Sequence, residues 1–295
     1  MRRYTYDAKN YPLSEIALES IQKHYPDVKD LSLLHEYVPA KKIGELAKII
    51  GKDLADTNFY EIFDKLLEDY VSLGEILVQR FGNIRINIPN QDKDGTVLPF
   101  HQGQWVGNGL GLRTVWLPFT DAYDSNSLQL VNLMDSRAIT DACKEWDYLR
   151  LQEECKKYCE PVNIRKGQFI LFTQEHIHGA AANRTGKTRM SVDVRLLLKD
   201  GQPHRKWPGA YFRKLHDTDI HSRKVEIKDN DNVVMYAEYE GFKTRYIDLH
   251  FQTLTVKDYC NRMGYTFPHQ TGDNEGRRHT YLEYLIQEGN LDHIM

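Results

Sequence analysis

Two histidines far apart in the sequence are the residues best suited to metal chemistry. His101 and His178 are 77 positions apart (178 minus 101), and each lies in or beside a short apolar run that predicts a β-strand. Imidazoles on different strands of a rigid barrel can hold a metal ion on one side. Iron(II) that activates oxygen needs such a site, because positions must stay open for a co-substrate and for oxygen. The pair therefore predicts a metal centre with open coordination positions.

An arginine and a serine follow the second histidine at a spacing that suits an anion anchor. Arg189 lies eleven residues after His178 (189 minus 178), on what reads as the next strand. A keto acid that chelates a metal leaves its far carboxylate without a partner, and the planar guanidinium pairs with carboxylates bidentately. Ser191 shares the strand parity of Arg189, so its hydroxyl can point to the same side. We expect both residues to bind one anionic co-substrate.

The segments around these residues resemble the phytanoyl-CoA dioxygenase superfamily of iron(II)- and 2-oxoglutarate-dependent oxygenases. The resemblance covers roughly residues 84–198 and is far more specific than any single motif, because its parts occur in order. These parts are PFHQGQW (99–105), TVWLPFTDA (114–122), GQFILF (167–172) leading to His178-Gly179, and Arg189-Met190-Ser191. The resemblance implies His101 and His178 as iron ligands, Arg189 and Ser191 as the 2-oxoglutarate anchor, and Thr114 as a further cofactor contact.

The chain departs from the family at Gly103, where other members carry the aspartate or glutamate that completes the iron site. In the family, glycine or alanine here marks aliphatic halogenases, in which a halide fills the vacated coordination position. Three other interpretations stay open. Gln102, Gln104 or Glu175 could replace the ligand, His176 could form a three-histidine site, or the site could be inactive. The sequence thus allows hydroxylation or, with chloride, chlorination.

Four further residues are candidates for substrate contacts: Gln104, Trp105, His176 and Arg195. Trp105 could equally pack inside the barrel, and Arg195 could be part of a structural ion pair or hold an anionic substrate group. Scattered positions in residues 233–289 resemble the small sporadic carbohydrate cluster proteins of bacterial surface-polysaccharide gene clusters. That resemblance implies a carbohydrate or nucleotide-sugar substrate. We expect oxidation of an unactivated C–H bond in a small polar molecule.

The elements that must position these residues change type along the chain. Three- and four-residue apolar spacing predicts helices over 41–50 and 59–81, and strand patterns interrupted by one helix follow. The predicted strands are 84–88, 98–101, 114–117, 128–131, 168–172 and 189–198, and the helix is 140–158. Helices followed by many short strands predict a mainly β fold, a double-stranded β-helix (jelly-roll, cupin-like) core supported by N-terminal helices.

The pattern changes again beyond residue 200, which predicts a second, small α/β domain. The polar stretch 200–228 reads as a linker or lid, so we place the oxygenase domain at 1–225 and the appendage at 226–295. The appendage is expected to contain strand 233–237, helix 249–262, strand 265–267 and helix 281–287. It is too short to make a large core alone, so we expect it to dock on the barrel.

The composition argues against several classes of partner. A net charge of −3 at pH 7 gives no reason to expect nucleic acid or an anionic membrane, and no apolar run approaches the ~20 residues of a membrane helix. The four cysteines show no zinc-like pairing of pairs, which predicts reduced thiols and a cytoplasmic protein. A homo-oligomer is compatible with the sequence. The rival functions are a cupin-like metal isomerase or epimerase and a non-catalytic sugar-binding barrel in polysaccharide biosynthesis.

Overall fold

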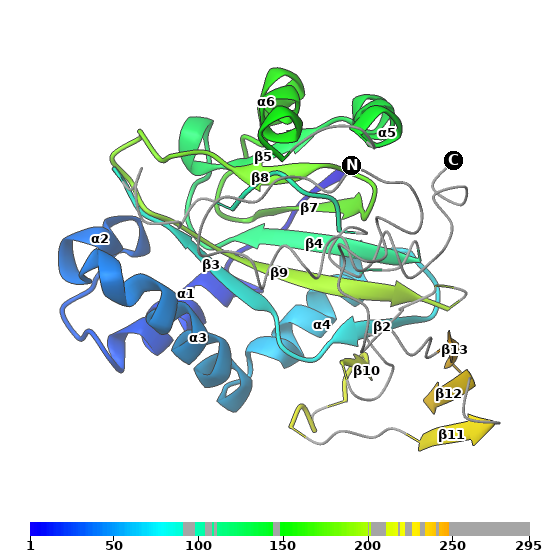
Figure 1. The fold of residues 1–295 in the computed structure, drawn as a ribbon. Coiled ribbons are helices and arrows are strands. Elements are labelled where there is room, and N and C mark those ends of the chain that lie inside the picture. Colours follow the sequence, from blue (N-terminus) through cyan, green and yellow to red (C-terminus); the bar gives the residue numbers. More distant parts are fainter. Residues whose placement is uncertain are drawn as a thin grey trace.

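The computed structural model describes most of the first 200 residues and parts of the following 50. The described residues are 1–90, 98–103, 108, 111–143, 148–199, 201, 211–217, 219–221, 226–230, 234–239 and 242–247. Two antiparallel sheets form the centre, and helices lie outside them (Figure 1). None of the helices in this part of the chain is long and apolar enough to cross a membrane.

The larger sheet has seven strands in the order β1-β7-β4-β9-β2-β10, and β3 pairs with a further part of β9. Its strands are β1 (Arg2–Thr5), β2 (Ile76–Gln79), β3 (Asn83–Asn87), β4 (Leu112–Pro118), β7 (Gln168–Thr173), β9 (Arg189–Leu198) and β10 (Phe212–Lys214). Side chains alternate between the two faces of a strand. On β9, Met190, Val192 and Val194 therefore face one side, while Arg189 and Ser191 face the other.

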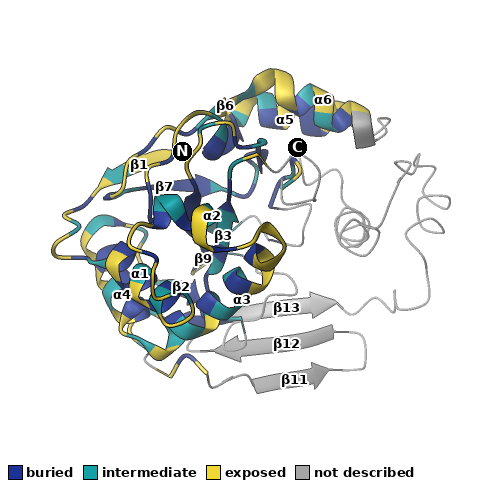
Figure 2. Ribbon diagram, turned by 90° about the vertical axis from the view of Figure 1, so that its left-hand side faces the viewer, coloured by how far each residue is buried: buried dark blue, intermediate teal, exposed yellow. Residues whose placement is uncertain are grey.

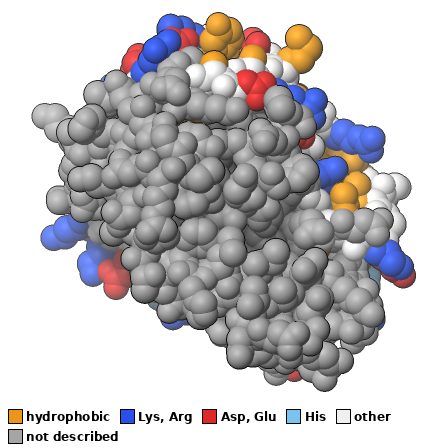
Figure 3. All heavy atoms as spheres, turned by 45° about the vertical axis from the view of Figure 1, so that its right-hand side comes forward, with side chains coloured by type: hydrophobic (Ala, Val, Ile, Leu, Met, Phe, Trp, Pro, Cys, Tyr) orange, Lys and Arg blue, Asp and Glu red, His pale blue; other side chains and the backbone are white. Residues whose placement is uncertain are grey.

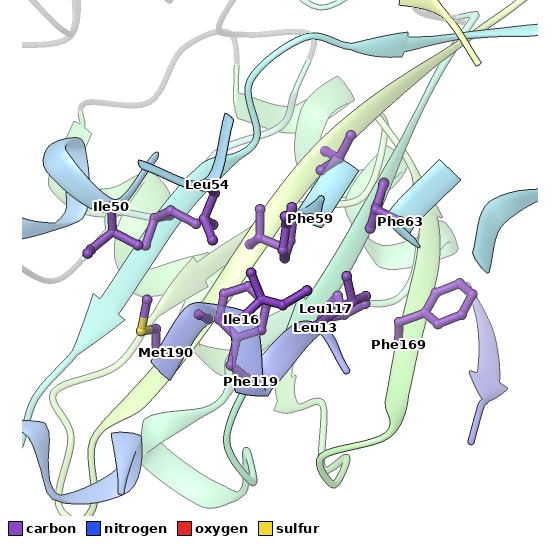
Figure 4. Packing of buried hydrophobic residues seen from close by; sticks show 14 of the residues in the cluster. Leu13, Ile16, Ile50, Leu54, Phe59, Phe63, Leu117, Phe119, Phe169 and Met190 are labelled. Carbon is purple, nitrogen blue, oxygen red and sulfur yellow. The ribbon is translucent and has the colours of Figure 1, made fainter. Parts of the chain in front are cut away.

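Helices from the first 70 residues cover the apolar face of this sheet. They are α1 (Leu13–Gln22), α2 (Leu34–Tyr37), α3 (Ile43–Asp53) and α4 (Phe59–Tyr70). Phe59 of α4 packs edge-on against Phe119 next to β4, with ring centroids 5.9 Å apart, and Ile50 and Met190 belong to the same cluster (Figure 4). The helices turn exposed residues outward and buried ones to the sheet (Figure 2). Apolar burial of this extent is the main stabilising contribution to the fold.

The smaller sheet, in the order β6-β5-β8, faces the other side of the larger sheet. Its strands are β5 (Leu128–Val131), β6 (Cys159–Pro161) and β8 (His178–Ala180), with helices α5 (Leu133–Ala142) and α6 (Tyr148–Tyr158) beyond it (Figure 1). Trp116 and Phe172 of the larger sheet share a buried cluster with Leu128 and Leu130 of the smaller one. Two antiparallel sheets packed around a common interior confirm the predicted jelly-roll core with N-terminal helices.

The structure corrects four predicted boundaries. The helix predicted over 59–81 ends at Tyr70, and β2 follows a turn in which Gly74 adopts φ 69°. The helix predicted over 140–158 is two helices, because Asn132 caps α5 earlier by accepting from the Asp135 amide. The strand predicted over 98–101 is reduced to an isolated bridge at His101, since Pro99 has no N–H for the ladder. The predicted linker 200–228 contains β10 and the start of β11.

The described part of the C-terminal region is a three-stranded antiparallel meander of β11 (Glu226–Asn230), β12 (Val234–Tyr239) and β13 (Phe242–Ile247). β12 confirms the predicted strand at 233–237. The elements predicted at 249–262, 265–267 and 281–287 lie outside the described residues, so the proposed domain boundary at 225/226 stays a prediction. On the side of the molecule shown in Figure 3, the coloured charged side chains of both signs are intermixed.

Candidate functional site

His101 and His178 lie directly opposite each other between two chain segments that run antiparallel. The His101 amide donates to the His178 carbonyl at 3.0 Å, and the His178 amide donates back to the His101 carbonyl at 2.9 Å. Directly opposed residues project their side chains to the same face. The two imidazole rings accordingly lie with their centroids 4.4 Å apart. The structure therefore brings together the two histidines that the sequence singled out.

Backbone carbonyls set the tautomer of both rings. The Nδ1 atom of His101 lies 2.9 Å from the Pro99 carbonyl, and Nδ1 of His178 lies 2.9 Å from the His176 carbonyl. A carbonyl oxygen only accepts, so each Nδ1 carries the proton and each Nε2 keeps a lone pair. This arrangement is typical of metal-binding histidines, in which a second-layer acceptor orients the ring.

Both rings are held in the neutral form that binds metal. Loss of solvation lowers the pKa of His101 to about 4. Burial, with a smaller contribution from the neighbouring His101, lowers the pKa of His178 well below its ordinary value of 6.5. At neutral pH neither imidazole must lose a proton before it can donate its lone pair. The donor set therefore fits a divalent transition metal.

Arg189 is buried on the inward face of β9 and is oriented by several hydrogen bonds. Its Nε donates to the Asn126 carbonyl at 3.1 Å, and its Nη1 donates to the Ser191 hydroxyl at 2.9 Å. The same hydroxyl oxygen lies 3.1 Å from the donor Nε1 of Trp116. Burial lowers the pKa of Arg189 to about 10, so the group stays charged at neutral pH. The predicted anchor residues Arg189 and Ser191 are thus in direct contact.

The inward faces of β3 and β9 carry more positive than negative charge. Asp193 lies between two arginines, with Arg85 Nε at 3.4 Å and Arg195 Nη1 at 3.3 Å from its Oδ2. With Arg189, three positive charges share one carboxylate. Arg195 is 7% exposed, and among the described residues its buried Nε has no hydrogen-bond partner. Such an excess of buried positive charge suits a small dianion, because a bound anion would supply the missing counter-charge.

Comparison with known proteins agrees with this geometry. Residues 51–191 match the model of the family described as phytanoyl-CoA dioxygenase (PhyH). The chain belongs to the phytanoyl-CoA dioxygenase-like superfamily. No curated protein matches the chain.

Several solved structures of non-haem enzymes share parts of the architecture. They include the non-heme monooxygenase ThoJ in complex with nickel (TM-score 0.40, 14% identity, covering 75% of this chain and 83% of ThoJ). The carbocyclase SnoK from nogalamycin biosynthesis gives 0.39 and 16%, covering 63% and 71% of the two chains. HygX from Streptomyces hygroscopicus, with nickel and 2-oxoglutarate bound, gives 0.39 and 11%, covering 69% and 82%. The assignment to the superfamily rests on the family match.

The space beside Gly103, where other superfamily members have their carboxylate, is filled by Gln174. A Cβ built on Gly103 would lie 1.8 Å from Gln174 Oε1. The Gly103 amide donates to the Gln174 carbonyl at 3.0 Å, and Gln174 Nε2 donates to the Thr114 hydroxyl at 2.8 Å. Sequence reasoning missed Gln174. Its position two residues after the inward-facing Phe172 was the signal that could have found it.

The other replacements considered for the missing carboxylate point elsewhere. Glu175 pairs with Arg137 at 2.7 Å, and Gln102 Nε2 donates to Thr140 of α5 at 2.6 Å. His176 Nδ1 lies 2.8 Å from the Thr173 hydroxyl. Over the described ranges, no three histidine, cysteine or carboxylate side chains converge on one point, so the three-histidine site is not formed. Gln104 and Trp105 lie outside the described residues.

Proposed function

We propose that this chain is an iron(II)- and 2-oxoglutarate-dependent oxygenase that hydroxylates an unactivated C–H bond of a small polar substrate. The observation that carries the proposal is the opposed pair His101 and His178, with both Nε2 lone pairs available on one face. These histidines would hold the iron. Arg189, supported by Ser191, would pair with the far carboxylate of 2-oxoglutarate, which is the co-substrate expected for this superfamily.

The bound iron and 2-oxoglutarate would supply the oxidation, in which the keto acid becomes succinate and carbon dioxide and a substrate C–H bond is oxidised. The protein's part is to orient and to exclude water. Carbonyl acceptors hold both imidazoles in one tautomer, and hydrogen bonds to the Asn126 carbonyl and the Ser191 hydroxyl hold the Arg189 guanidinium. Because Arg189 is buried, its pairing with a carboxylate is stronger than the same pairing in water.

Gln174 favours hydroxylation over chlorination. A halogenase needs an open position beside the metal, and here the volume next to Gly103 holds the Gln174 carboxamide. Chloride would enter only if that side chain moved. We therefore place chloride outside the cofactor set and keep iron(II), 2-oxoglutarate and oxygen.

The excess positive charge at the inward face supports a substrate that carries an anionic group. Arg195 and Arg85 share only Asp193, and Arg195 is the substrate-facing arginine that the sequence indicated. A nucleotide sugar or an acidic carbohydrate combines a polar body with such a group. The carbohydrate part of the proposal depends on the resemblance over 233–289. Thr114 is held by Gln174, and its predicted contact with a cofactor stays a prediction.

An anaerobic titration of the protein with iron(II) and 2-oxoglutarate tests the proposal. We expect a visible metal-to-ligand charge-transfer band that needs both components and is lost in His178→Ala and Arg189→Ala. The exposed Arg184 provides a matched control, and Arg184→Ala should keep the band. Bound metal without a band would reject 2-oxoglutarate as the co-substrate. A band that shifts when chloride is added would instead favour chlorination.

A further inference from the structure

We propose that the side-chain oxygen of Gln174 replaces the missing carboxylate as the third protein ligand of the metal. The inference rests on the proposed iron site at His101 and His178. It extends that site to a residue that lies outside the family's sequence motif, and it assigns the site two imidazoles and one neutral carboxamide oxygen.

The position of the Gln174 carboxamide is the first argument. Gly103 follows His101 by two residues, and such neighbours in extended chain project to the same side. A Cβ on Gly103 would lie 1.8 Å from Oε1 and 2.8 Å from Cδ of Gln174. The carboxamide thus occupies the volume into which an aspartate at position 103 would project. The hydrogen bond from the Gly103 amide to the Gln174 carbonyl, at 3.0 Å, holds the two segments together there.

The orientation of the carboxamide is the second argument. Nε2 donates to the Thr114 hydroxyl at 2.8 Å, which directs the nitrogen end toward β4. The oxygen end consequently faces Gly103 and not the wall of the barrel. Thr114 acts as a positioning residue, because its hydroxyl decides which end of the amide is presented. A hydroxyl-fixed carboxamide loses little rotamer freedom when it binds a ligand.

The third argument is that Gln174 Oε1 is buried without a partner. Gln174 is 1% exposed, and within the described part of the chain its Oε1 receives no hydrogen bond. Buried acceptors without a partner are rare in folded proteins, because burial removes the hydrogen bonds that water would otherwise donate. A carboxamide oxygen is a hard donor that suits divalent metals alongside imidazole. A metal at the histidine pair would provide the missing partner.

A neutral third ligand has two consequences for the site. The metal keeps one more unit of positive charge than in a site with a carboxylate, so we expect weaker intrinsic metal affinity and tighter pairing with the anionic co-substrate. Because Oε1 fills the volume beside Gly103, chloride is also excluded from that position. The glycine then serves to admit Gln174 and does not serve to admit a halide.

Cobalt(II) titration of the whole metal-free protein tests the assignment, with calorimetry for the dissociation constant and the visible ligand-field bands for the coordination. We expect Gln174→Ala to weaken cobalt binding at least tenfold and to change the bands. Gln174→Glu should restore or exceed the wild-type affinity, because a carboxylate replaces the amide at the same point. The matched control is Gln102→Ala, since Gln102 is equally buried and also has an unpartnered carboxamide oxygen but faces α5. Its affinity should stay within about twofold of wild type.

The outcomes separate this inference from the proposed function. If Gln174→Ala binds cobalt as tightly as wild type with the same bands, while His178→Ala does not bind it, Gln174 is not a ligand and the histidine site stands. A chloride-induced change of the bands in the wild-type protein would also overturn the assignment, because it would place a halide where Oε1 is expected. If the wild-type protein binds no metal, or binds it independently of both histidines, the proposed function fails and this inference with it.

Discussion

Two buried arginine clusters on opposite faces of the larger sheet are built in different ways. On the outer face, Arg213 of β10 forms a two-pronged ion pair with Asp64 of α4, at 2.6 and 2.8 Å, and both side chains are almost fully buried. On the inner face, Asp193 is shared by Arg85 and Arg195 at 3.4 and 3.3 Å. The outer cluster is balanced in charge, whereas the inner cluster is not.

This difference indicates which cluster is structural and which is functional. A buried charge without a counter-charge is costly, so it persists only where something else offsets the cost. The balanced pair joins a sheet strand to a helix and needs no ligand. The unbalanced face, which also contains Arg189, is stabilised when an anion binds. Substitutions in the two clusters should therefore change different properties of the protein.

The largest effect is expected at the balanced pair. Asp64→Ala leaves Arg213 buried and unpaired and should lower the free energy of unfolding by about 3–5 kcal/mol. Urea unfolding measures this loss. The double replacement Asp64→Leu with Arg213→Met should cost much less, because no charge remains buried. A loss below about 1 kcal/mol in Asp64→Ala would show that the pair is not structural.

The inner cluster should respond in ligand affinity and not in stability. Arg189→Leu is expected to weaken 2-oxoglutarate binding at least 100-fold, about 2.7 kcal/mol, because the carboxylate loses its bidentate partner. The free energy of unfolding of the ligand-free protein should stay the same or rise, since a buried, unbalanced charge is removed. Calorimetry with metal present measures the affinity, and Arg184→Ala is the control. Equal affinity in Arg189→Leu would move the anchor to Arg195 or Arg85.

A methyl group at position 103 should destabilise the site. Gly103→Ala places a Cβ where Gln174 Oε1 lies, which should cost about 1–3 kcal/mol of stability from overpacking. The double variant with Gln174→Ala should recover most of this loss in a double-mutant cycle. Gly44→Ala is the control, because a Cβ at this position in α3 meets no atom within 4 Å. A neutral Gly103→Ala would instead indicate the open space of a halogenase.

The smallest effect concerns pH. Burial keeps the pKa of His178 well below 6.5, so the unfolded chain takes up a proton first as the pH falls. The stabilising contribution is complete above pH 6.5 and is lost as the pH falls from there toward the pKa of the folded state. Between pH 6.5 and 5.5 the metal-free protein should lose about 1 kcal/mol from this residue. Urea unfolding at both values, with His178→Gln as the flatter comparison, measures the slope.

Much of the site could be predicted from sequence because it follows from strand periodicity. The run 189–198 matches β9 residue for residue, and the two-residue period correctly placed Arg189 and Ser191 on one face. The pairing of His101 with His178 was expected from their motifs. Local chemistry that the periodicity does not register, such as the cap at Asn132 and the missing N–H of Pro99, moved the element boundaries.

By itself, the sequence determined the class of fold, the family and the pair of metal-binding histidines, because each depends on residue types at fixed spacings along the chain. Only the tertiary structure decided what fills the space beside Gly103 and which charges remain unbalanced. Gln174, Thr114 and Gly103 lie on three separate segments, and their contact depends on sheet register and side-chain rotamers. No spacing along the chain encodes these distances, so the replacement of the carboxylate became visible only after the strands were assembled.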